Sequence, residues 1–226
     1  MRIDILTLFP EMFTPLRESI IGRALKSGKV EIVVTDIRDY STDKHKRCDD
    51  YTFGGGAGMV LMPEPIGNAI EALDPLHEAK RIYMSPKGKT FKQKDVSSLI
   101  ECKRLMFLCG HYEGVDQRII DLYIDEEMSI GDYVLTGGEL PAMVITDAVC
   151  RYIDGVISKE SLKSETFTDN LVEYPQYTRP QVYKGLAVPE IIVSGDHAKV
   201  DQWRKEQSLL LTKKLRPDLL EDDIKS

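Results

Sequence analysis

The stretch Ser129-Ile-Gly-Asp-Tyr-Val-Leu-Thr-Gly-Gly-Glu-Leu-Pro-Ala-Met143 places three glycines where an apolar pattern would otherwise predict a buried strand. Gly131 follows an apolar pair, and Gly137 and Gly138 precede Pro141, a residue that suits the first turn of a helix. Because glycine weakens a strand, its use there indicates a turn or a close approach by a ligand. We therefore predict a strand, a tight loop and a helix start, with main-chain N–H and C=O groups available to a small molecule.

A second apolar run ends in the same way. Residues 105–109 are followed by Gly110 and Gly114, with Glu113 between the two glycines. Either loop alone would more often be a surface turn. Ligands of open α/β sheets bind at the carboxyl ends of strands, however, so two glycine-flanked strand ends indicate one shared crevice.

The composition limits the class of protein. The chain has 226 residues, 42% apolar and 30% charged, which fits one large domain or a domain with a smaller companion. No apolar run approaches the roughly 20 residues that span a bilayer. The N-terminus has an acid inside its apolar run and no small-residue cleavage site, so it is predicted to be a strand rather than a signal peptide. We expect a cytoplasmic protein with no membrane partner.

Cysteine and charge exclude further classes. The four cysteines form no C-x-x-C pair and the four histidines are scattered, so free thiols in a reducing compartment are expected, and no metal site. A net charge of −7 argues against a general nucleic-acid binder. Any phosphate contacts would have to come from local basic patches.

Strands alternate with helices along most of the chain, which predicts a parallel α/β sheet. Strands are expected at 3–9, 31–36, 81–84 and 105–109 and around Met128, and helices at 12–27, 66–73, 93–101, 115–122 and 141–153. A turn is expected at 85–88, and the polar stretch 38–58 shows no periodicity. The sequence turns polar again from 158 to 170, and a last helix is expected at 198–211. These patterns predict an α/β domain over 1–158, a flexible linker over 159–175 and a small helical domain over 176–226.

Two further features remain open at this level. The glycine-rich run 54–59 is neither a dinucleotide-binding nor a phosphate-loop motif, so a mobile surface loop and a phosphate-approaching loop are equally favoured. Arg151 falls on the last turn of the helix that follows the first crevice. An ion pair with Asp147 is the commoner explanation, but its guanidinium could also face a ligand.

Seven motifs, in order and over most of the chain, resemble the bacterial tRNA (guanine-N1)-methyltransferase family, TrmD, of the SPOUT superfamily. They are Leu8-Phe-Pro-Glu-Met-Phe13, Phe53-Gly-Gly-Gly-Ala-Gly-Met59, Ser85-Pro-Lys-Gly88, Cys109-Gly-His-Tyr-Glu-Gly114, Ile130-Gly-Asp-Tyr-Val-Leu-Thr-Gly-Gly-Glu-Leu-Pro-Ala-Met143, Tyr177-Thr-Arg-Pro180 and Leu186-Ala-Val-Pro189.

The resemblance implies a SPOUT-type parallel sheet with a deep trefoil knot that binds S-adenosylmethionine, plus the small, mainly helical C-terminal domain. Knots of this kind are rare exceptions among folds. The knot walls would be 83–86, 109–114 and 129–138. The cofactor-binding residues implied are Tyr83, Met84, Ser85, Pro86, Gly110, Tyr112, Glu113, Gly114, Ser129, Ile130, Gly131, Asp132, Tyr133, Val134, Leu135, Gly137, Gly138 and Pro141.

The implied reaction is methylation of N1 of the guanosine 3′ of the anticodon (position 37) in tRNA. A carboxylate can take the N1 proton, and an arginine can stabilise the charge that develops on O6. By resemblance the arginine is Arg151. The family carries Asp-Ser-Phe in the linker where this chain has Glu165-Thr-Phe167, so we assign the base to Glu165, with Asp169 as the second choice. In the homodimer that the resemblance implies, the linker would come from the other subunit.

The partners follow from the same resemblance. Basic residues of the C-terminal domain would contact tRNA phosphates, and Mg²⁺ would assist. Two alternatives stay open, a SPOUT methyltransferase acting on ribose or rRNA, and a non-catalytic RNA-binding protein that kept the knot. The basic residues concerned are Arg179, Lys184, Lys199, Arg204, Lys205, Lys213 and Lys214.

Overall fold

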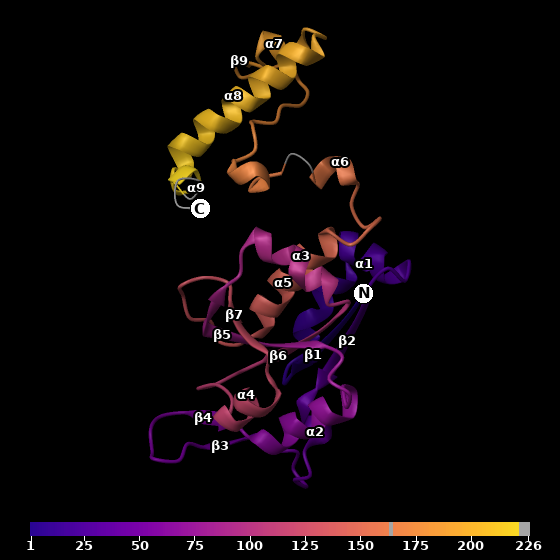
Figure 1. The fold of residues 1–226 in the computed structure, drawn as a ribbon, viewed down its shortest axis with the longest axis vertical. Coiled ribbons are helices and arrows are strands. Elements are labelled where there is room, and N and C mark those ends of the chain that lie inside the picture. The colour runs from indigo at the N-terminus through magenta and orange to yellow at the C-terminus, as the bar shows by residue number, and fades with distance from the viewer. Residues whose placement is uncertain (163–164, 222–226) are drawn as a thin grey trace. The chain divides into compact units, whose positions relative to one another are not determined.

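The structure, a computed structural model, describes residues 1–162 and 165–221 and divides into two compact units (Figure 1). The first unit is Met1–Ile157 and the second is Ser158–Ser226. The second unit includes both the predicted linker and the predicted C-terminal domain. Residues 163 and 164 of that linker lie outside the described residues.

A five-stranded sheet forms the centre of the first unit, in the order β2-β1-β6-β5-β7. Every neighbouring pair is parallel, which confirms the predicted α/β fold with a parallel sheet. The knot stays a prediction. The strands are β1 (Arg2–Thr7), β2 (Glu31–Asp36), β5 (Lys80–Thr90), β6 (Arg104–Cys109) and β7 (Glu126–Ser129).

Helices cover both faces of this sheet (Figure 1). On one face lie α1 (Ser19–Lys26), α3 (Val96–Glu101) and α5 (Glu139–Arg151), and on the other lie α2 (Pro63–Leu73) and α4 (Gln117–Tyr123). Alternate side chains of β6 enter opposite cores, with Phe107 packing on the α5 side and Met106 on the α2 side. A strand that is buried on both faces consists of an unbroken run of apolar residues, and this run is why β6 could be predicted from the sequence.

Two predicted segments differ from the structure. The helix expected over 12–27 is divided into a 3-10 helix, η1 (Pro10–Arg17), and α1, because Pro15 lacks an N–H and Ser19 adopts a positive φ of 54°. The polar stretch 38–58 begins within a short 3-10 helix, η2 (Ile37–Tyr40). It continues into an antiparallel hairpin of β3 (Asp49–Tyr51) and β4 (Met59–Leu61), which encloses the glycine-rich run. A third 3-10 helix, η3 (Gln93–Asp95), precedes α3.

The turn expected at 85–88 is wrong, because β5 continues to Thr90. Its register against β7 shifts, so Met128 lies opposite Met84 and again opposite Lys89. Such an irregularity accommodates a proline inside a strand. At Gly88 a Cβ atom would lie 2.4 Å from the carbonyl carbon of Glu127, so only glycine allows β5 to pass this close to β7.

A buried ionic network lies at the amino ends of the strands. Asp4 on β1 accepts from the Arg104 guanidinium at 2.9 Å, and Arg104 also reaches Asp74 at 3.2 Å. Asp74 pairs with Arg81 at 2.9 Å, and the side chains of Asp4 and Asp74 are fully buried. Burial acts to raise the pKa of Asp74, but hydrogen bonds from the Glu78 N–H and the Arg81 side chain hold it below the ordinary value.

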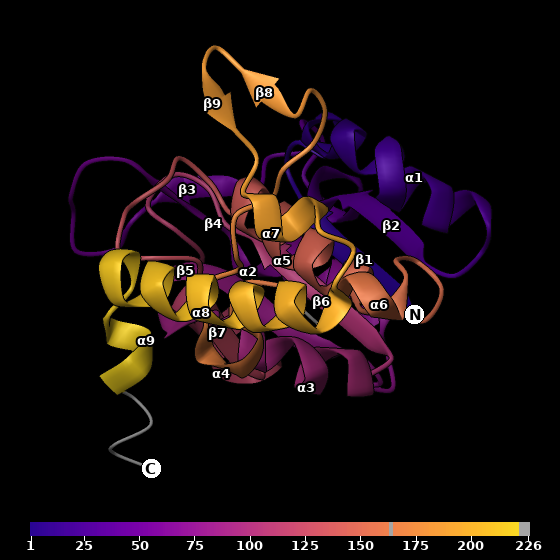
Figure 2. The ribbon, with the colours of Figure 1, turned by 90° about the horizontal axis from the view of Figure 1, so that it is seen from above.

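The second unit is organised around one long helix, α8 (His197–Leu215), which includes the predicted helix 198–211 (Figure 2). Asp196 caps its start by accepting from the Lys199 N–H at 3.2 Å, and Pro217 follows its end. The remaining elements are α6 (Lys159–Leu162), η4 (Thr168–Asn170), the antiparallel pair β8 (Val182–Tyr183) and β9 (Leu186–Ala187), α7 (Glu190–Val193), which packs on α8, and α9 (Asp218–Glu221).

Within the described residues, none of the helices combines the length and apolar character needed to cross a bilayer.

Candidate active site

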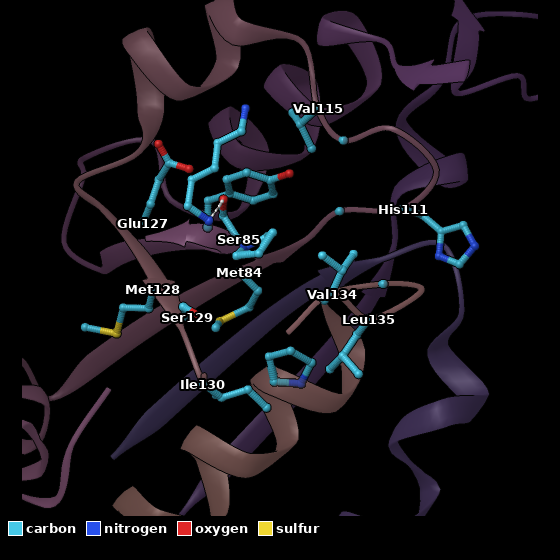
Figure 3. Close-up of a pocket in the computed structure, with 18 of the residues that line it drawn as sticks. Met84, Ser85, His111, Val115, Glu127, Met128, Ser129, Ile130, Val134 and Leu135 are labelled. Carbon is cyan, nitrogen blue, oxygen red and sulfur yellow. Dashed lines mark hydrogen bonds between the residues drawn. The ribbon is translucent and has the colours of Figure 1, made fainter. Parts of the chain in front are cut away.

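A cavity of about 270 Å³ lies beside the irregular middle of β5 and at the carboxyl ends of β6 and β7. Figure 3 shows Met84 from β5, His111 from the loop after β6, and Ile130 and Leu135 from the stretch after β7 around one space. Three segments far apart in the sequence therefore form one pocket, as the two glycine-flanked strand ends predicted.

The pocket gathers all but one of the residues that the family resemblance implied for cofactor binding. Asp132 is the exception, since it is not among the lining residues. Lys87, His111 and Thr136 were missed although all three lie inside quoted motifs. Glu127 and Met128 were missed because strand residues just before a glycine loop carry no distinct signal. The lining residues that sequence reasoning did not name are Lys87, His111, Val115, Gln117, Ile120, Glu127, Met128 and Thr136.

Glycine is required where α5 begins beneath the pocket. The Gly138 N–H donates to the Gly110 carbonyl at 2.9 Å, which joins the start of α5 to the end of β6. A Cβ atom on Gly138 would lie 2.8 Å from the Cα of Cys109 and 3.0 Å from the Cβ of Met84. These atoms belong to the strands, so the backbone can approach this closely only without a side chain.

The glycine-rich loop of the β3–β4 hairpin adjoins the pocket. The Glu113 N–H donates to the Met59 carbonyl, and the Leu61 N–H donates to the Gly114 carbonyl, both at 3.0 Å. A Cβ atom on Gly58 would lie 2.5 Å from the Cγ of Glu113, a pocket-lining residue. The sequence left the role of the glycine-rich run 54–59 open, and the structure places this run directly beside the candidate site.

Polar groups under the pocket are strongly shielded from water. Burial, assisted by the charge of Glu127, raises the pKa of Tyr83 to about 12, so its hydroxyl stays protonated and can donate a hydrogen bond. The fully buried carboxylate of Glu139 accepts from the Thr7 hydroxyl at 2.8 Å. Burial and the charge of Glu139 also raise the pKa of Cys109, which therefore remains an unreactive thiol.

Arg151 lies at the opposite end of α5 from the pocket. Gly138 and Pro141, at the start of the helix, line the cavity, whereas Arg151 is its last residue. Each residue of an α-helix rises about 1.5 Å, so the two ends of α5, Glu139 and Arg151, lie about 18 Å apart along its axis. Arg151 therefore lies on the last turn of the helix, as the sequence predicts, but far from the cavity of its own chain.

The predicted bases Glu165 and Asp169 both belong to the second unit. They line a cavity of about 380 Å³ with Asp201, Arg204 and Lys205 of α8. The Arg204 guanidinium stacks 5.0 Å from the ring centre of Tyr174, which lines the same cavity. Neither unit by itself contains the complete set of predicted catalytic residues.

Known proteins resemble this chain along nearly its whole length. The family model described as tRNA (Guanine-1)-methyltransferase TrmD matches residues 1–222. A curated relative named tRNA (guanine-N(1)-)-methyltransferase from Ruminiclostridium cellulolyticum is 56% identical over 223 residues, covering 97% of this chain and 96% of the relative. Proteins of the same name from Alkaliphilus oremlandii and from Clostridium botulinum (strain 657 / Type Ba4) are each 52% identical. The first covers 99% of this chain and 94% of its own length, and the second 97% and 92%.

Proposed function

Because this chain belongs to the tRNA (guanine-1)-methyltransferase family TrmD, we propose that it methylates N1 of the guanosine 3′ of the anticodon (position 37) in tRNA, with S-adenosylmethionine as the methyl donor. One observation carries the proposal. The three segments that the family resemblance assigns to a knotted cofactor site converge on a single cavity beside β5 and at the carboxyl ends of β6 and β7.

The residues of the cavity fit an adenosine-containing cofactor. At about 270 Å³ its size is near the lower end of the roughly 300–1,000 Å³ of small-molecule sites. Gly110 and Gly138 leave main chain rather than side chain facing it, and the Tyr133 and Leu135 backbone would hold the adenine and ribose. The carboxylate of Glu113 would face the cationic sulfonium. When bound, the cofactor supplies an electrophilic methyl group.

The chain's own residues would carry the proton transfer. Guanine N1 becomes nucleophilic when its proton leaves, and the Glu165 carboxylate would accept that proton. Glu165 has the chemistry of the family's aspartate on a side chain one methylene longer, and the nearby Asp169 is the second choice. The Arg151 guanidinium would stabilise the negative charge that develops on O6.

The position of Arg151 supports a homodimer with a composite site. Along α5 it lies about 15 Å from Pro141, the nearest pocket-lining residue of that helix in its own chain, which exceeds the reach of an arginine side chain. An Arg151 and a Glu165 supplied by the second subunit would complete each pocket. We also propose a cytoplasmic location, where tRNA and the donor are both present.

Mg²⁺, which the resemblance also implies, stays a proposal, and no residue is assigned to it. Among the described residues there is no group of three or more His, Cys, Asp or Glu side chains that could hold a metal ion. Mg²⁺ is commonly bound through one or two carboxylates together with waters and substrate phosphates. No step of the proposed reaction uses the metal.

Methyl transfer to two tRNA transcripts tests the proposal. One transcript carries guanosine just 3′ of the anticodon and the other carries adenosine there. We expect transfer of the labelled methyl group to the first alone. Equal transfer to both transcripts would reject the proposed methylation site. If Glu165→Gln and Asp169→Asn both keep full activity on the first transcript, a base in the linker is rejected.

Mixed dimers test the composite site. Arg151→Ala chains and Gly138→Ala chains should each form inactive or weak homodimers. If pocket and arginine come from different subunits, co-expressed heterodimers regain one working site, whereas residues acting within one chain would give no recovery.

A further inference from the structure

The segment that carries Glu165 is bound to α8 through a buried threonine. The Val172 N–H donates to Oγ1 of Thr212 at 2.9 Å, and the Thr212 hydroxyl donates to the Ser208 carbonyl at 2.7 Å. The Thr212 side chain is fully buried. Its hydroxyl oxygen therefore both accepts and donates, and it satisfies an N–H of the linker backbone inside the second unit.

Packing alone gives no reason for a hydroxyl at this position. A buried threonine within a helix is a weaker helix former than the straight-chain residues, because its branched side chain loses rotamer freedom and its hydroxyl can bond back to the preceding turn. Valine would occupy nearly the same volume, but it would leave the Val172 N–H without its acceptor. The linker contact accounts for the hydroxyl.

The segment held by Thr212 has an unfavourable backbone that needs such a restraint. Phe167, Asp169 and Asn170 adopt positive φ values of 74°, 54° and 56°, a region that non-glycine residues seldom occupy. Conformations of this kind persist only where the surroundings enforce them. Two contacts besides the one at Thr212 do so, from the Phe167 N–H to the Leu171 carbonyl at 2.8 Å and from the Glu173 N–H to the Thr166 hydroxyl at 3.2 Å.

The anchor and the candidate base lie on the same side of α8. Ser208, whose carbonyl accepts from Thr212 one turn away, lines the cavity that also contains Glu165 and Asp169. Val172 lines it as well. A shift of the linker at Val172 would thus be transmitted over a few residues to both carboxylates.

We propose that Thr212 is a positioning residue for the methyl-transfer reaction. It fixes the register of residues 165–173 on α8, so that the carboxylate of Glu165 is presented in one place. The inference rests on the proposed function, because it takes Glu165 as the base. The Thr212 side chain is fully buried within the second unit, so it would act through the linker backbone that it holds.

The test compares Thr212→Val, Thr212→Ser and Thr146→Val in the full-length protein. Thr146 is the matched control, because it is equally buried on a helix and its hydroxyl has no hydrogen-bond partner among the described residues. Misplacing a catalytic group by about 1 Å can cost about 100-fold, so Thr212→Val should lower kcat between about 10- and 100-fold. The KM for S-adenosylmethionine should not change. Thr212→Ser, which keeps the hydroxyl, should restore most of kcat, and Thr146→Val should resemble the wild type.

A double-mutant cycle with Glu165→Gln separates positioning from a general structural role. If Thr212 acts through Glu165, adding Thr212→Val to Glu165→Gln should reduce kcat no further. If the two substitutions instead lower kcat independently, so that their fold-losses multiply, the inference is overturned. It is also overturned if Thr212→Val keeps the wild-type kcat, or if Thr212→Ser is as slow as Thr212→Val.

Amide hydrogen exchange distinguishes failure of this inference from failure of the proposed function. Thr212→Val should speed exchange at residues 165–173 while leaving the first unit unchanged. If Glu165→Gln retains full activity, the assignment of the base is wrong and the catalytic role of Thr212 is rejected with it. Unchanged exchange would reject the anchor itself, whatever the identity of the base.

Discussion

The two ends of the central sheet serve opposite purposes, and β5 and β6 contribute to both. At the carboxyl ends of β6 and β7 and beside the middle of β5, glycines expose main-chain groups around a cavity. At the amino ends of β1, β5 and β6, charged side chains satisfy one another in a buried network of Asp4, Asp74, Arg81 and Arg104. The comparison shows that polar groups stay available for a ligand at the cavity, whereas the charged groups at the amino ends are already paired with one another.

The buried ionic network and the glycine-flanked strand ends affect different properties of the protein. A buried ion pair stabilises a fold only while every partner is present, because a single remaining charge is very unfavourable in the interior. A glycine-rich strand end weakens the fold slightly and leaves room for a ligand. Changes at the amino ends should therefore alter folding stability, and changes at the carboxyl ends should alter cofactor affinity.

The largest effect is expected from Asp74→Ala. It removes the partner of Arg81 and one partner of Arg104, whose side chains are only 7% and 17% exposed. Breaking such a pair typically costs about 3–5 kcal/mol, so the urea midpoint should fall steeply. S-adenosylmethionine affinity of the folded fraction should stay the same. Asp39→Ala, at the exposed pair with Lys46, is the control and should leave the midpoint unchanged.

Gly138→Ala, by contrast, should mainly lower the affinity for S-adenosylmethionine. A Cβ 2.8 Å from the Cα of Cys109 forces the start of α5 away from β6, at about 1–3 kcal/mol of strain. We expect the Kd for S-adenosylmethionine to rise at least about tenfold, which corresponds to about 1.4 kcal/mol, as measured by calorimetry. Gly67→Ala in α2 is the matched control. Its Cβ would meet nothing closer than 3.5 Å, and alanine is the better helix former there. Equal losses in both variants would contradict the comparison.

The ionic end should also be sensitive to acid. The folded pKa of Asp74 lies below its unfolded value of about 3.9, so the unfolded state binds the proton more readily. The contribution of Asp74 to stability is present above that pH and is lost as pH falls through the folded pKa. One group contributes at most about 1.4 kcal/mol per pH unit, and denaturation of the wild type and Asp74→Asn between pH 2 and 6 should reveal this difference in slope. Parallel curves would show that Asp74 does not titrate as proposed.

Tyr83→Phe should have the smallest effect. The half-buried Tyr83 lies in the pocket beside Gly110, and burial together with the charge of Glu127 raises the pKa of its hydroxyl to about 12. Losing one neutral hydrogen bond costs about 0.5–1.5 kcal/mol, so cofactor affinity should fall less than in Gly138→Ala. If Tyr83→Phe lowers folding stability but leaves cofactor affinity unchanged, the hydroxyl has a structural role rather than a role in cofactor binding.

Much of the candidate site could be predicted because its signals are local. Glycines after apolar runs mark strand ends that approach a ligand or another backbone, and the sequence alone identifies Gly110, Gly137 and Gly138 in this way. Asp132, by contrast, was included only because it lies between pocket residues in the sequence. Neighbours in a loop point in different directions, so its position outside the cavity lining could not be derived from its place in the chain.

The errors in the predicted fold come from contacts between segments that are distant in the sequence. Ser85-Pro-Lys-Gly88 has the composition of a turn, yet these residues extend β5 because Gly88 lies against the backbone of β7. Only the neighbouring strand provides the reason for that glycine. The hairpin of β3 and β4 is likewise stabilised by pairing between short strands and by contacts to Glu113 and Gly114, none of which produces a periodic pattern.

The sequence by itself determined the alternation of strands and helices, the parallel sheet and the glycine-flanked strand ends, because apolar periodicity and backbone freedom are properties of neighbouring residues. Only the tertiary structure decided that β5 continues past the cavity, that the β3–β4 hairpin adjoins the cavity, and that the linker is anchored at Thr212. Those facts depend on contacts between residues tens of positions apart, and such contacts are set by the packing of the whole unit.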